Sequence, residues 1–447
     1  MISFSFPDSF LWGSGSSSFQ IEGAATIGGK GASVWDRACE VFPERFSKNA
    51  TPAVAADFYH RYRDDIAMMK ELGLKSFRLS IAWARLFPSG DGALNQEGAD
   101  FYSSVIDCLL AHQIEPFVDL YHWDLPQALQ DDGGFENPKL IDQFTRYAET
   151  CFRLYGDRVK LWSTFNEPSV VALSSYYHKS FPPYKDDLVA ALKASQNLLL
   201  MHYSAIKKYR EMEQDGKIGA VIAFVPIYPK TPGTLDDEAA VRQEDIVCNW
   251  WLRPMFQGKY PESIIQDEEY MVAMPEGFEE ELLTAFEPMD FVGINYYYPA
   301  LTAHCPDSHL RSKPVEVYYG QSDYGFPIYP PGLYDSLRYI SEHYGNPEIY
   351  LTENGLGNFR LQTLDEEIED DNRIDFLREH LRQLSRAIRS GCNVRGYYYW
   401  SHFDDFEGDA GYDINFGLLH VDRETLERTP RKSWHYYKRC IERNRGD

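Results

Sequence analysis

The chain lacks several features that mark particular classes of protein. Its 447 residues contain no C-x-x-C pair, and its seven cysteines are odd in number and widely spaced. This pattern excludes a disulfide framework and a cysteine zinc site, and it is typical of buried thiols in a reducing compartment. No apolar run is long enough to span a membrane, and the first residues show no basic region followed by an apolar run. We therefore expect no membrane partner, no secretory signal and a cytoplasmic location.

Positive charge is also scarce, since 44 Lys and Arg stand against 68 Asp and Glu for a formal net charge of −24. Such a field repels nucleic acid and anionic membranes, so we expect no nucleic-acid partner. The sequence has no phosphate-binding loop, no nucleotide-binding fingerprint and no cluster of metal ligands. We therefore expect neither a cofactor nor a metal. The oligomeric state stays open at this stage.

Aromatic residues, in contrast, are abundant: they make up 15% of the chain and comprise 31 Tyr, 27 Phe and 9 Trp. One interpretation is a tyrosine-rich core. The other is a carbohydrate-binding cleft, in which rings stack on the apolar faces of sugars while Tyr and Trp tips make hydrogen bonds. Composition alone leaves both interpretations open.

Short apolar runs alternate along the chain with longer segments of helical spacing, and no linker or short repeat interrupts them. Strands that alternate with helices predict a parallel sheet, and eight such units favour a closed barrel. We therefore expect an α/β fold, a single (β/α)8 TIM barrel with extended βα loops, as one domain over residues 1–447. The predicted strands are Phe10–Ser16, Ser76–Trp83, Glu115–His122, Leu161–Phe165, Ile218–Tyr228, Asp290–Tyr298, Glu348–Thr352 and Val394–Trp400. The predicted helices are Ala55–Leu72, Ala99–His112, Pro138–Tyr155, Asp187–Gln214, Gly332–Tyr344 and Asp371–Ser390, and the predicted long βα loops are Pro229–Met289 and Ala303–Pro330.

Polar side chains gather where these predicted strands end. In barrel enzymes the carboxyl ends of the strands carry the chemistry, so we expect the functional residues there. The strand-end segments are Tyr121-His122-Trp123-Asp124, Asn166-Glu167-Pro168, Asn295, Glu353-Asn354-Gly355 and Trp400.

Glu167 and Glu353 occur in the same sequence pattern. Each directly follows an apolar predicted strand and precedes a turn-forming residue. A glutamate at the mouth of a barrel is desolvated, which raises its pKa. Two carboxyl groups about 5–5.5 Å apart cleave a glycosidic bond with retention, whereas a wider gap admits water and gives inversion. The plainer alternative is two glutamates that serve as helix caps or ion-pair partners.

At these motifs the sequence resembles glycoside hydrolase family 1, the β-glucosidase family. The resemblance extends almost from end to end, and the motifs together are far more specific than any one of them. Besides the two glutamate motifs, it rests on Phe10-Leu11-Trp12-Gly13, Gln20-Ile21-Glu22-Gly23, Ser33-Val34-Trp35-Asp36, Phe77-Arg78-Leu79-Ser80-Ile81-Ala82-Trp83, His122-Trp123-Asp124-Leu125-Pro126, Gly293-Ile294-Asn295-Tyr296-Tyr297, Trp400-Ser401, Glu407 and Phe416-Gly417-Leu418.

The resemblance implies a retaining β-glycosidase, most simply a β-glucosidase acting on a small glycoside or oligosaccharide. Glu353 would be the nucleophile, and Glu167 the general acid and then base. Arg78, Asn166, Asn295 and Tyr297 would support the nucleophile and the transition state, and Gln20, His122, Trp123, Trp400 and Glu407 would bind the sugar. Plainer roles stay open for two of them: a structural ion pair for Arg78 and a satisfied buried histidine for His122.

Two variants of the family are disfavoured by the residues present. Thioglucosidase members replace the acid/base glutamate, whereas Glu167 stands in this chain. Phospho-glycosidase members lose the carboxylate equivalent to Glu407 and supply a lysine shortly after it. Here no Lys or Arg occurs between Ser401 and His420, and a carboxylate would repel a sugar 6-phosphate.

The sequence departs from the family pattern at two residues that we expect to influence specificity. Gly408 stands where a sugar-contacting Trp is usual, and Phe326 stands where a Trp usually borders the aglycone site. Loss of the indole at Gly408 predicts a larger glycone pocket that admits a substituted or disaccharide glycone, unless a nearby aromatic such as Tyr412 fills the space. A transglycosylase that uses the same residues is a further alternative, and a catalytically weak sugar-binding protein is a remote one. The natural glycone, aglycone and linkage stay open.

Overall fold

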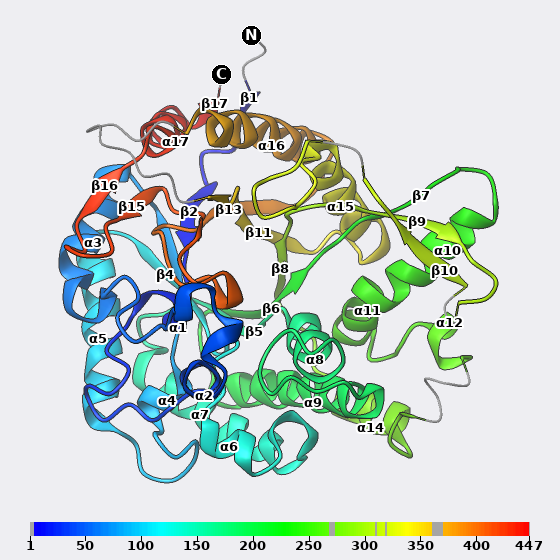
Figure 1. Cartoon of the computed structure of the whole chain (residues 1–447), viewed down its shortest axis with the longest axis horizontal. Helices are drawn as coiled ribbons and strands as arrows, with labels where there is room; N and C mark the ends of the chain where they lie inside the picture. The colour runs from blue at the N-terminus through cyan, green and yellow to red at the C-terminus, as the bar shows by residue number, and fades with distance from the viewer. Residues whose placement is uncertain (1–3, 268–272, 309–310, 318–319, 360–369, 447) are drawn as a thin grey trace.

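Eight parallel strands form a closed barrel at the centre of the molecule (Figure 1). The structure is a computed structural model, and it describes residues 4–267, 273–308, 311–317, 320–359 and 370–446. Around the barrel the strands follow their order in the sequence, so the expected (β/α)8 fold is confirmed. They are β2 (Leu11–Gly15), β3 (Ser76–Ser80), β4 (Glu115–Asp119), β5 (Leu161–Asn166), β6 (Lys217–Ala223), β8 (Phe291–Asn295), β11 (Glu348–Asn354) and β13 (Val394–Trp400).

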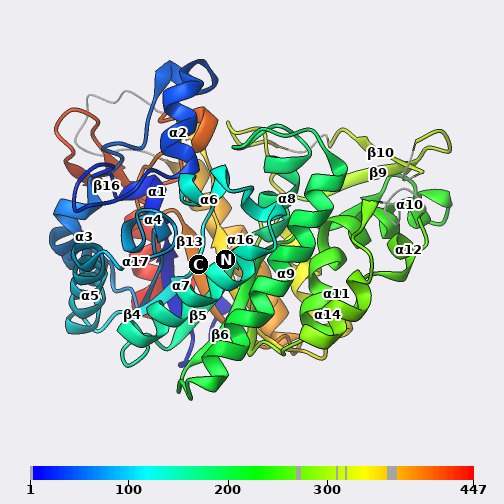
Figure 2. The same ribbon diagram turned by 90° about the horizontal axis from the view of Figure 1, so that it is seen from below.

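Helices surround the barrel, and neighbouring ones such as α5, α7 and α9 pack against one another on its outer side (Figure 2). Their apolar residues recur at helical spacing and turn towards the strands. In α7, for example, Phe144 stacks on Phe165 at 4.8 Å and Tyr147 stacks on Trp83 at 4.7 Å between ring centroids. The main outer helices are α3 (Phe58–Leu72), α5 (Gln96–Ala111), α7 (Lys139–Tyr155), α9 (Leu188–Glu211), α15 (Pro330–His343), α16 (Asp371–Arg389) and α17 (Lys432–Arg443).

The amino-terminal half of the barrel interior is filled by a buried, largely aromatic cluster. Phe117 lies at its centre, with its ring centroid 5.5 Å from those of both Phe291 and Tyr398. Leu161 and Tyr350 complete the cluster. This cluster fills one half of the barrel interior. The polar residues at the carboxyl ends of the strands therefore lie above a layer of apolar side chains.

One predicted strand is wrong in its extent. The segment Ile218–Tyr228 divides into β6, which ends at Ala223, and β7 (Ile227–Pro229), which joins a separate three-stranded sheet with β9 (Ala300–His304) and β10 (Ser312–Val315). Pro226 lies between the two parts. Proline has no backbone N–H, so a barrel strand cannot continue its ladder through it.

The two predicted long loops contain structure of their own. Residues 229–289 carry α10 (Leu235–Glu244), α11 (Trp250–Gln257), α12 (Glu262–Ile265) and α14 (Phe278–Ala285), and residues 303–330 carry the end of β9 and all of β10. Both predicted loops run partly through residues outside the described set. Among the helices of the described residues, none combines the length and apolar character that a membrane crossing requires. The two ends of the described chain meet where β1 (Phe4–Ser5) pairs with β17 (Arg445–Gly446) (Figure 1).

Candidate active site

The two predicted glutamates lie where their strands lose regular geometry. Asn166 ends β5, Glu167 takes a left-handed conformation with φ +48°, and Pro168 begins α8 (Pro168–Tyr176). A non-glycine residue in this region carries strain of about 1–3 kcal/mol, and such strain clusters at functional sites. On the facing side, β11 shifts register against β8 between Leu351 and Glu353. Irregularities of this kind re-aim the side chains that follow them.

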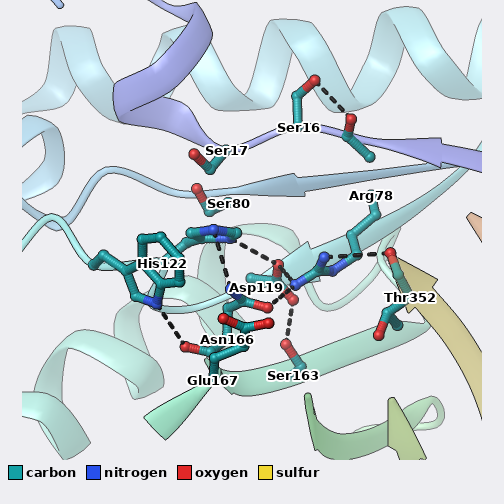
Figure 3. Close-up of polar contacts among 12 residues, drawn as sticks. Ser16, Ser17, Arg78, Ser80, Asp119, His122, Ser163, Asn166, Glu167 and Thr352 are labelled. Carbon is teal, nitrogen blue, oxygen red and sulfur yellow. Dashed lines mark hydrogen bonds and ion pairs between the residues drawn. The ribbon is translucent and has the colours of Figure 1, made fainter. Parts of the chain in front are cut away.

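Arg78 connects several strands of the barrel, and Figure 3 shows its guanidinium in contact with Asp119, Asn166 and Thr352. Its Nη1 donates to Glu353 Oε1 at 2.7 Å, and its Nη2 donates to Asn166 Oδ1 at 2.6 Å. The same guanidinium forms a second ion pair with Asp119 at 2.7 Å. Arg78 and Asp119 are fully buried, so these contacts act without solvent screening.

Asp119 is a site residue that the sequence analysis missed. It ends β4, and its carboxylate also accepts a hydrogen bond from Ser163. Burial alone would raise its pKa, but the Arg78 charge, His122 and the Ser163 hydrogen bond together outweigh burial and lower the pKa below the ordinary value. Its position after the apolar run 116–118 is the same strand-end signal that identified Glu167. Asp119 therefore stabilises Arg78 from below.

Glu353 is held from a second side by Tyr297, whose hydroxyl donates to Oε2 at 2.7 Å. Burial and the Glu353 charge raise the pKa of Tyr297 well above 10, so the phenol keeps its proton and remains a donor. Arg78 and Tyr297 together occupy one lone-pair direction on each oxygen of Glu353. Both contacts favour the ionised carboxylate.

Glu167 has a different environment. Its Oε1 accepts a hydrogen bond from Asn295 Nδ2 at 2.8 Å, and Thr352 in turn donates to Asn295 Oδ1 at 2.7 Å. No Lys or Arg forms an ion pair with Glu167 among the described residues. Burial, followed by the charge of Glu353, raises the pKa of Glu167 to about 8. Glu167 therefore holds a proton at neutral pH.

His122 and Trp123 bound the same space. His122 Nε2 faces Asn166 Nδ2 at 3.1 Å, and Trp123 Nε1 donates to the Asn166 carbonyl at 3.1 Å. The His122 ring stacks on Trp400 at 5.5 Å. Burial lowers the pKa of His122, so the neutral ring accepts from Asn166 through Nε2.

A cavity of about 540 Å³ opens above these groups. Arg78 and Asn166 lie directly beneath it, joined to its walls by the hydrogen bonds described above. The predicted site residues that line it are Gln20, His122, Trp123, Glu167, Asn295, Tyr297, Phe326, Glu353, Trp400, Glu407 and Gly408. The structure therefore brings together all of the residues that the sequence analysis selected.

Glu407 forms the far wall of the cavity. Burial raises its pKa to about 7, although the nearby side chains of Gln20 and Trp400 favour its charged form. The aromatic wall opposite includes Phe326, whose ring centroid lies 4.6 Å from Tyr298 and 4.8 Å from Tyr324. These side chains offer acceptors and ring faces to a hydroxyl-rich molecule.

At Gly408 the neighbouring aromatic is Trp35, which the sequence analysis did not consider. A Cβ built on Gly408 would lie 3.4 Å from Trp35 Cη2, and the backbone there has φ +52°. Tyr412, the residue suggested from the sequence, packs instead against Phe406 at 5.7 Å and donates its hydroxyl to the Thr51 carbonyl at 2.7 Å. That suggestion was therefore wrong, because the two chain segments approach only in the folded structure.

Comparison with known proteins gives one consistent family. The sequence profile of Glycosyl hydrolase family 1 matches residues 2–446. The chain is 40% identical to Beta-glucosidase A of Acetivibrio thermocellus over 99% of this chain and 100% of that protein. It is 39% identical to 6-phospho-beta-glucosidase GmuD of Bacillus subtilis over 98% of this chain and 97% of that protein. It also superimposes, with a TM-score of 0.96 and 37% identity over 100% of both chains, on a Thermotoga maritima family 1 glycoside hydrolase complexed with a cyclophellitol analogue transition state mimic.

Proposed function

The chain belongs to glycosyl hydrolase family 1 and is a glycosidase, and from this premise we propose that it is a retaining β-glucosidase acting on unphosphorylated β-D-glycosides. One observation carries the proposal: a single cavity holds two carboxyl groups in unequal environments. Glu353 accepts hydrogen bonds from Arg78 and Tyr297, whereas the pKa of Glu167 is raised to about 8 by burial and by the Glu353 charge. Such a pair provides a nucleophile and an acid. On this proposal residues 1–447 act as one catalytic domain in the cytoplasm.

In the first step a Glu353 oxygen attacks the anomeric carbon of the bound sugar. The bond to the glycosidic oxygen breaks, and Glu167 gives that oxygen its proton, so the aglycone leaves as a neutral alcohol. The sugar is then joined to Glu353 as an ester, and Glu167 is ionised.

In the second step water attacks the same carbon and Glu167 takes one of its protons. The bond to Glu353 breaks, and the sugar leaves with the original configuration. Esterification removes the Glu353 charge, which is one of the two causes that raise the pKa of Glu167. The pKa of Glu167 therefore falls in the second step. The ionised side chain can then act as a base and accept a proton from water.

Asn166 is suited to hold the sugar 2-hydroxyl throughout. Its Oδ1 accepts from Arg78 and Asn295, at 2.6 and 3.1 Å, so the orientation of the amide is fixed. One Nδ2 hydrogen is directed to His122 and the second is available to the substrate. Gln20 and Glu407 line the same cavity and are suited to bind the remaining hydroxyls.

The charge of the cavity supports an unphosphorylated sugar. None of the described residues that line it is Lys or Arg, whereas Glu167, Glu353, Glu407 and Asp409 are acidic. Phosphate recognition relies on Arg or Lys donors. The 6-phospho-beta-glucosidase from Bacillus subtilis is nevertheless similar in sequence, so the substrate test must include the phosphorylated sugar.

We would measure nitrophenol release from aryl β-glucoside, galactoside, fucoside, 6-phosphoglucoside and a β-1,6-linked disaccharide glycoside, with wild type beside Glu353→Ala. Strong glucoside turnover that the substitution abolishes supports the proposal. Preference for the 6-phosphoglucoside would contradict it. Binding without turnover of any substrate would indicate a sugar-binding protein, and transfer to an added sugar acceptor in place of water would indicate a transglycosylase.

A disaccharide or substituted glycone is the second candidate, and one observation favours it. Beyond Glu407 the cavity continues past Gly408 to Asp409, whose Oδ1 is buried and accepts no hydrogen bond among the described residues. A carboxylate oxygen in that state suits the hydroxyls of an additional sugar. Turnover of the disaccharide glycoside that exceeds turnover of the glucoside would favour this candidate.

A further inference from the structure

Asp405 lies directly behind Glu407 and takes no part in the steps described above. Its side chain is fully buried and is absent from the cavity wall, whereas Glu407 lines the cavity. The two carboxyl groups are in hydrogen-bonding contact with each other. In the part of the chain that the structure describes, both oxygens of Asp405 and Oε1 of Glu407 are buried and accept no hydrogen bond from an N–H or O–H donor.

The cations of this region are engaged elsewhere. Arg431 forms its ion pair with Asp404 at 2.5 Å. Arg423 donates to the Asp404 backbone carbonyl at 2.9 Å and lies over the Tyr412 ring at 4.4 Å. Among the described residues, no Lys or Arg makes an ion pair with Asp405 or Glu407. Nothing in contact therefore balances a double negative charge on the pair.

Two buried carboxylates in contact cannot both be ionised without a counter-charge. Burial and the neighbouring carboxylate raise the pKa of both groups, that of Asp405 well above its ordinary range. Glu407 is the better anion of the two, because the side chains of both Gln20 and Trp400 lower its pKa, whereas the Ser401 hydroxyl does so for Asp405. The last proton of the pair therefore belongs on Asp405.

We propose that Asp405 is a positioning residue: a neutral carboxylic acid that donates a hydrogen bond to the Glu407 carboxylate and holds it towards the sugar hydroxyls. This inference rests on the proposed function of the site. Glu407 then presents acceptor oxygens to the substrate while its own orientation is fixed from behind. Loss of the proton from Asp405 at alkaline pH places two like charges in contact, turns Glu407 out of position and weakens sugar binding.

The pH dependence expected of the Asp405–Glu407 pair can be distinguished from that of the other titratable groups around it. Asp404 is already ionised, because Arg431, His420 and Arg373 together outweigh burial and lower its pKa to about 2. Burial raises the pKa of Tyr412 to about 12 and that of Cys39 to about 12, so both stay neutral at the pH of interest. The remaining titratable neighbours are Glu353, Tyr297 and Tyr324 across the cavity and Asp409 on the same segment.

The kinetic test compares Asp405→Asn with Asp405→Leu over the pH range of activity. An asparagine amide donates the same hydrogen bond, so at about pH 8, above the pKa of about 7 of Glu407, we expect its KM for an aryl glucoside to stay within about twofold of wild type, whereas Leu raises KM about tenfold or more. At alkaline pH, KM of wild type rises and KM of Asp405→Asn does not. The alkaline fall of kcat, which depends on Glu167, persists in both variants. Equal KM values for Asn and Leu, or an unchanged alkaline rise in Asn, would overturn the proposal.

An infrared measurement separates this inference from the proposed function, because it requires no turnover. The difference spectrum of wild type minus Asp405→Asn at neutral pH should contain the carbonyl stretch of a protonated carboxylic acid. The matched control is Asp186→Asn, which removes an exposed carboxylate paired with Lys179 and should yield carboxylate bands alone. A difference spectrum for Asp405 that also contains only carboxylate bands would show an ionised side chain and disprove the inference, whether or not the enzyme cleaves glycosides.

Discussion

Arg78 and Glu353 form a buried ion pair in which Nη1 lies 2.7 Å from Oε1. Because Arg78 also pairs with Asp119 at 2.7 Å, one guanidinium orients the proposed nucleophile and is itself fixed from the opposite side. The fork geometry of arginine is what permits both contacts.

We therefore expect Arg78→Lys to lower kcat for an aryl glucoside by about 10²-fold or more while KM changes little, because an ammonium group cannot make both contacts and Glu353 loses its alignment. Steady-state kinetics test this, with thermal unfolding as a check that the barrel is intact. The outcome that contradicts it is near-normal kcat in a folded variant, which would reduce Arg78 to a structural ion pair.

Tyr297→Phe removes the second donor to Glu353 and little else, since the ring remains. Loss of one hydrogen bond to a charged group costs about 1.5–3 kcal/mol, so we expect kcat/KM to fall by about 10- to 100-fold. Because the lost contact aligns the proposed nucleophile, most of the fall should be in kcat. Steady-state kinetics of the two proteins, measured side by side, test this. A loss confined to KM, with kcat unchanged, would assign Tyr297 to substrate binding instead.

On the proposed mechanism Glu167 carries a proton in the first step, and its pKa of about 8 would then set the alkaline limit of activity. The rate in wild type should therefore fall as pH rises through about 8. Glu167→Gln should lose about 10²- to 10⁴-fold on glycosides with poor leaving groups and less on nitrophenyl glycosides, whose aglycone leaves without a proton. The alkaline limb of the first step should disappear in this variant. Equal losses on both classes of substrate would argue against Glu167 as the acid.

The sequence predicted the barrel well because strand and helix periodicities are local properties. All eight barrel strands overlap the apolar runs that predicted them, and the largest error in extent, in the segment Ile218–Tyr228, follows from Pro226. Glu167 and Glu353 were found for a similar reason, since each stands at the end of its own strand.

Contacts between distant segments were not predictable in this way. Nothing local to Asp119 indicates that its partner is Arg78, and nothing local to Gly408 indicates that Trp35 packs beside it. Asp405 escaped notice because its protonation depends on burial and on the absence of a nearby cation, which are properties of the folded chain. Local patterns therefore identified the chemistry, and tertiary packing determined the support around it.

Two substitutions of Gly408 distinguish an effect on stability from an effect on substrate specificity. A side chain at φ +52° is strained, and its Cβ would lie 3.4 Å from Trp35, so Gly408→Ala should lower the free energy of unfolding by about 1 kcal/mol with glucoside turnover little changed. Gly408→Trp should in addition restrict the cavity and reduce turnover of a disaccharide glycoside more than turnover of a glucoside. Denaturant unfolding and the substrate panel measure the two effects. If Gly408→Trp folds and leaves the substrate profile unchanged, the larger glycone pocket is ruled out.

The raised pKa of Glu167 also has a consequence for stability. Its pKa is about 8 in the folded protein and has its ordinary value of 4.5 when exposed. Between these values the unfolded chain releases a proton that the folded chain retains, so this group lowers the free energy of unfolding as pH rises, by up to about 1.4 kcal/mol per pH unit. Glu167→Gln keeps the size and the backbone strain at φ +48° but cannot titrate. We therefore expect the variant to resemble wild type in stability near pH 4.5 and to become progressively more stable than wild type towards pH 8. Denaturant melts at several pH values test this. A stability difference that does not vary with pH would mean that Glu167 is ionised in the folded protein, and it would remove the basis for its assignment as the acid.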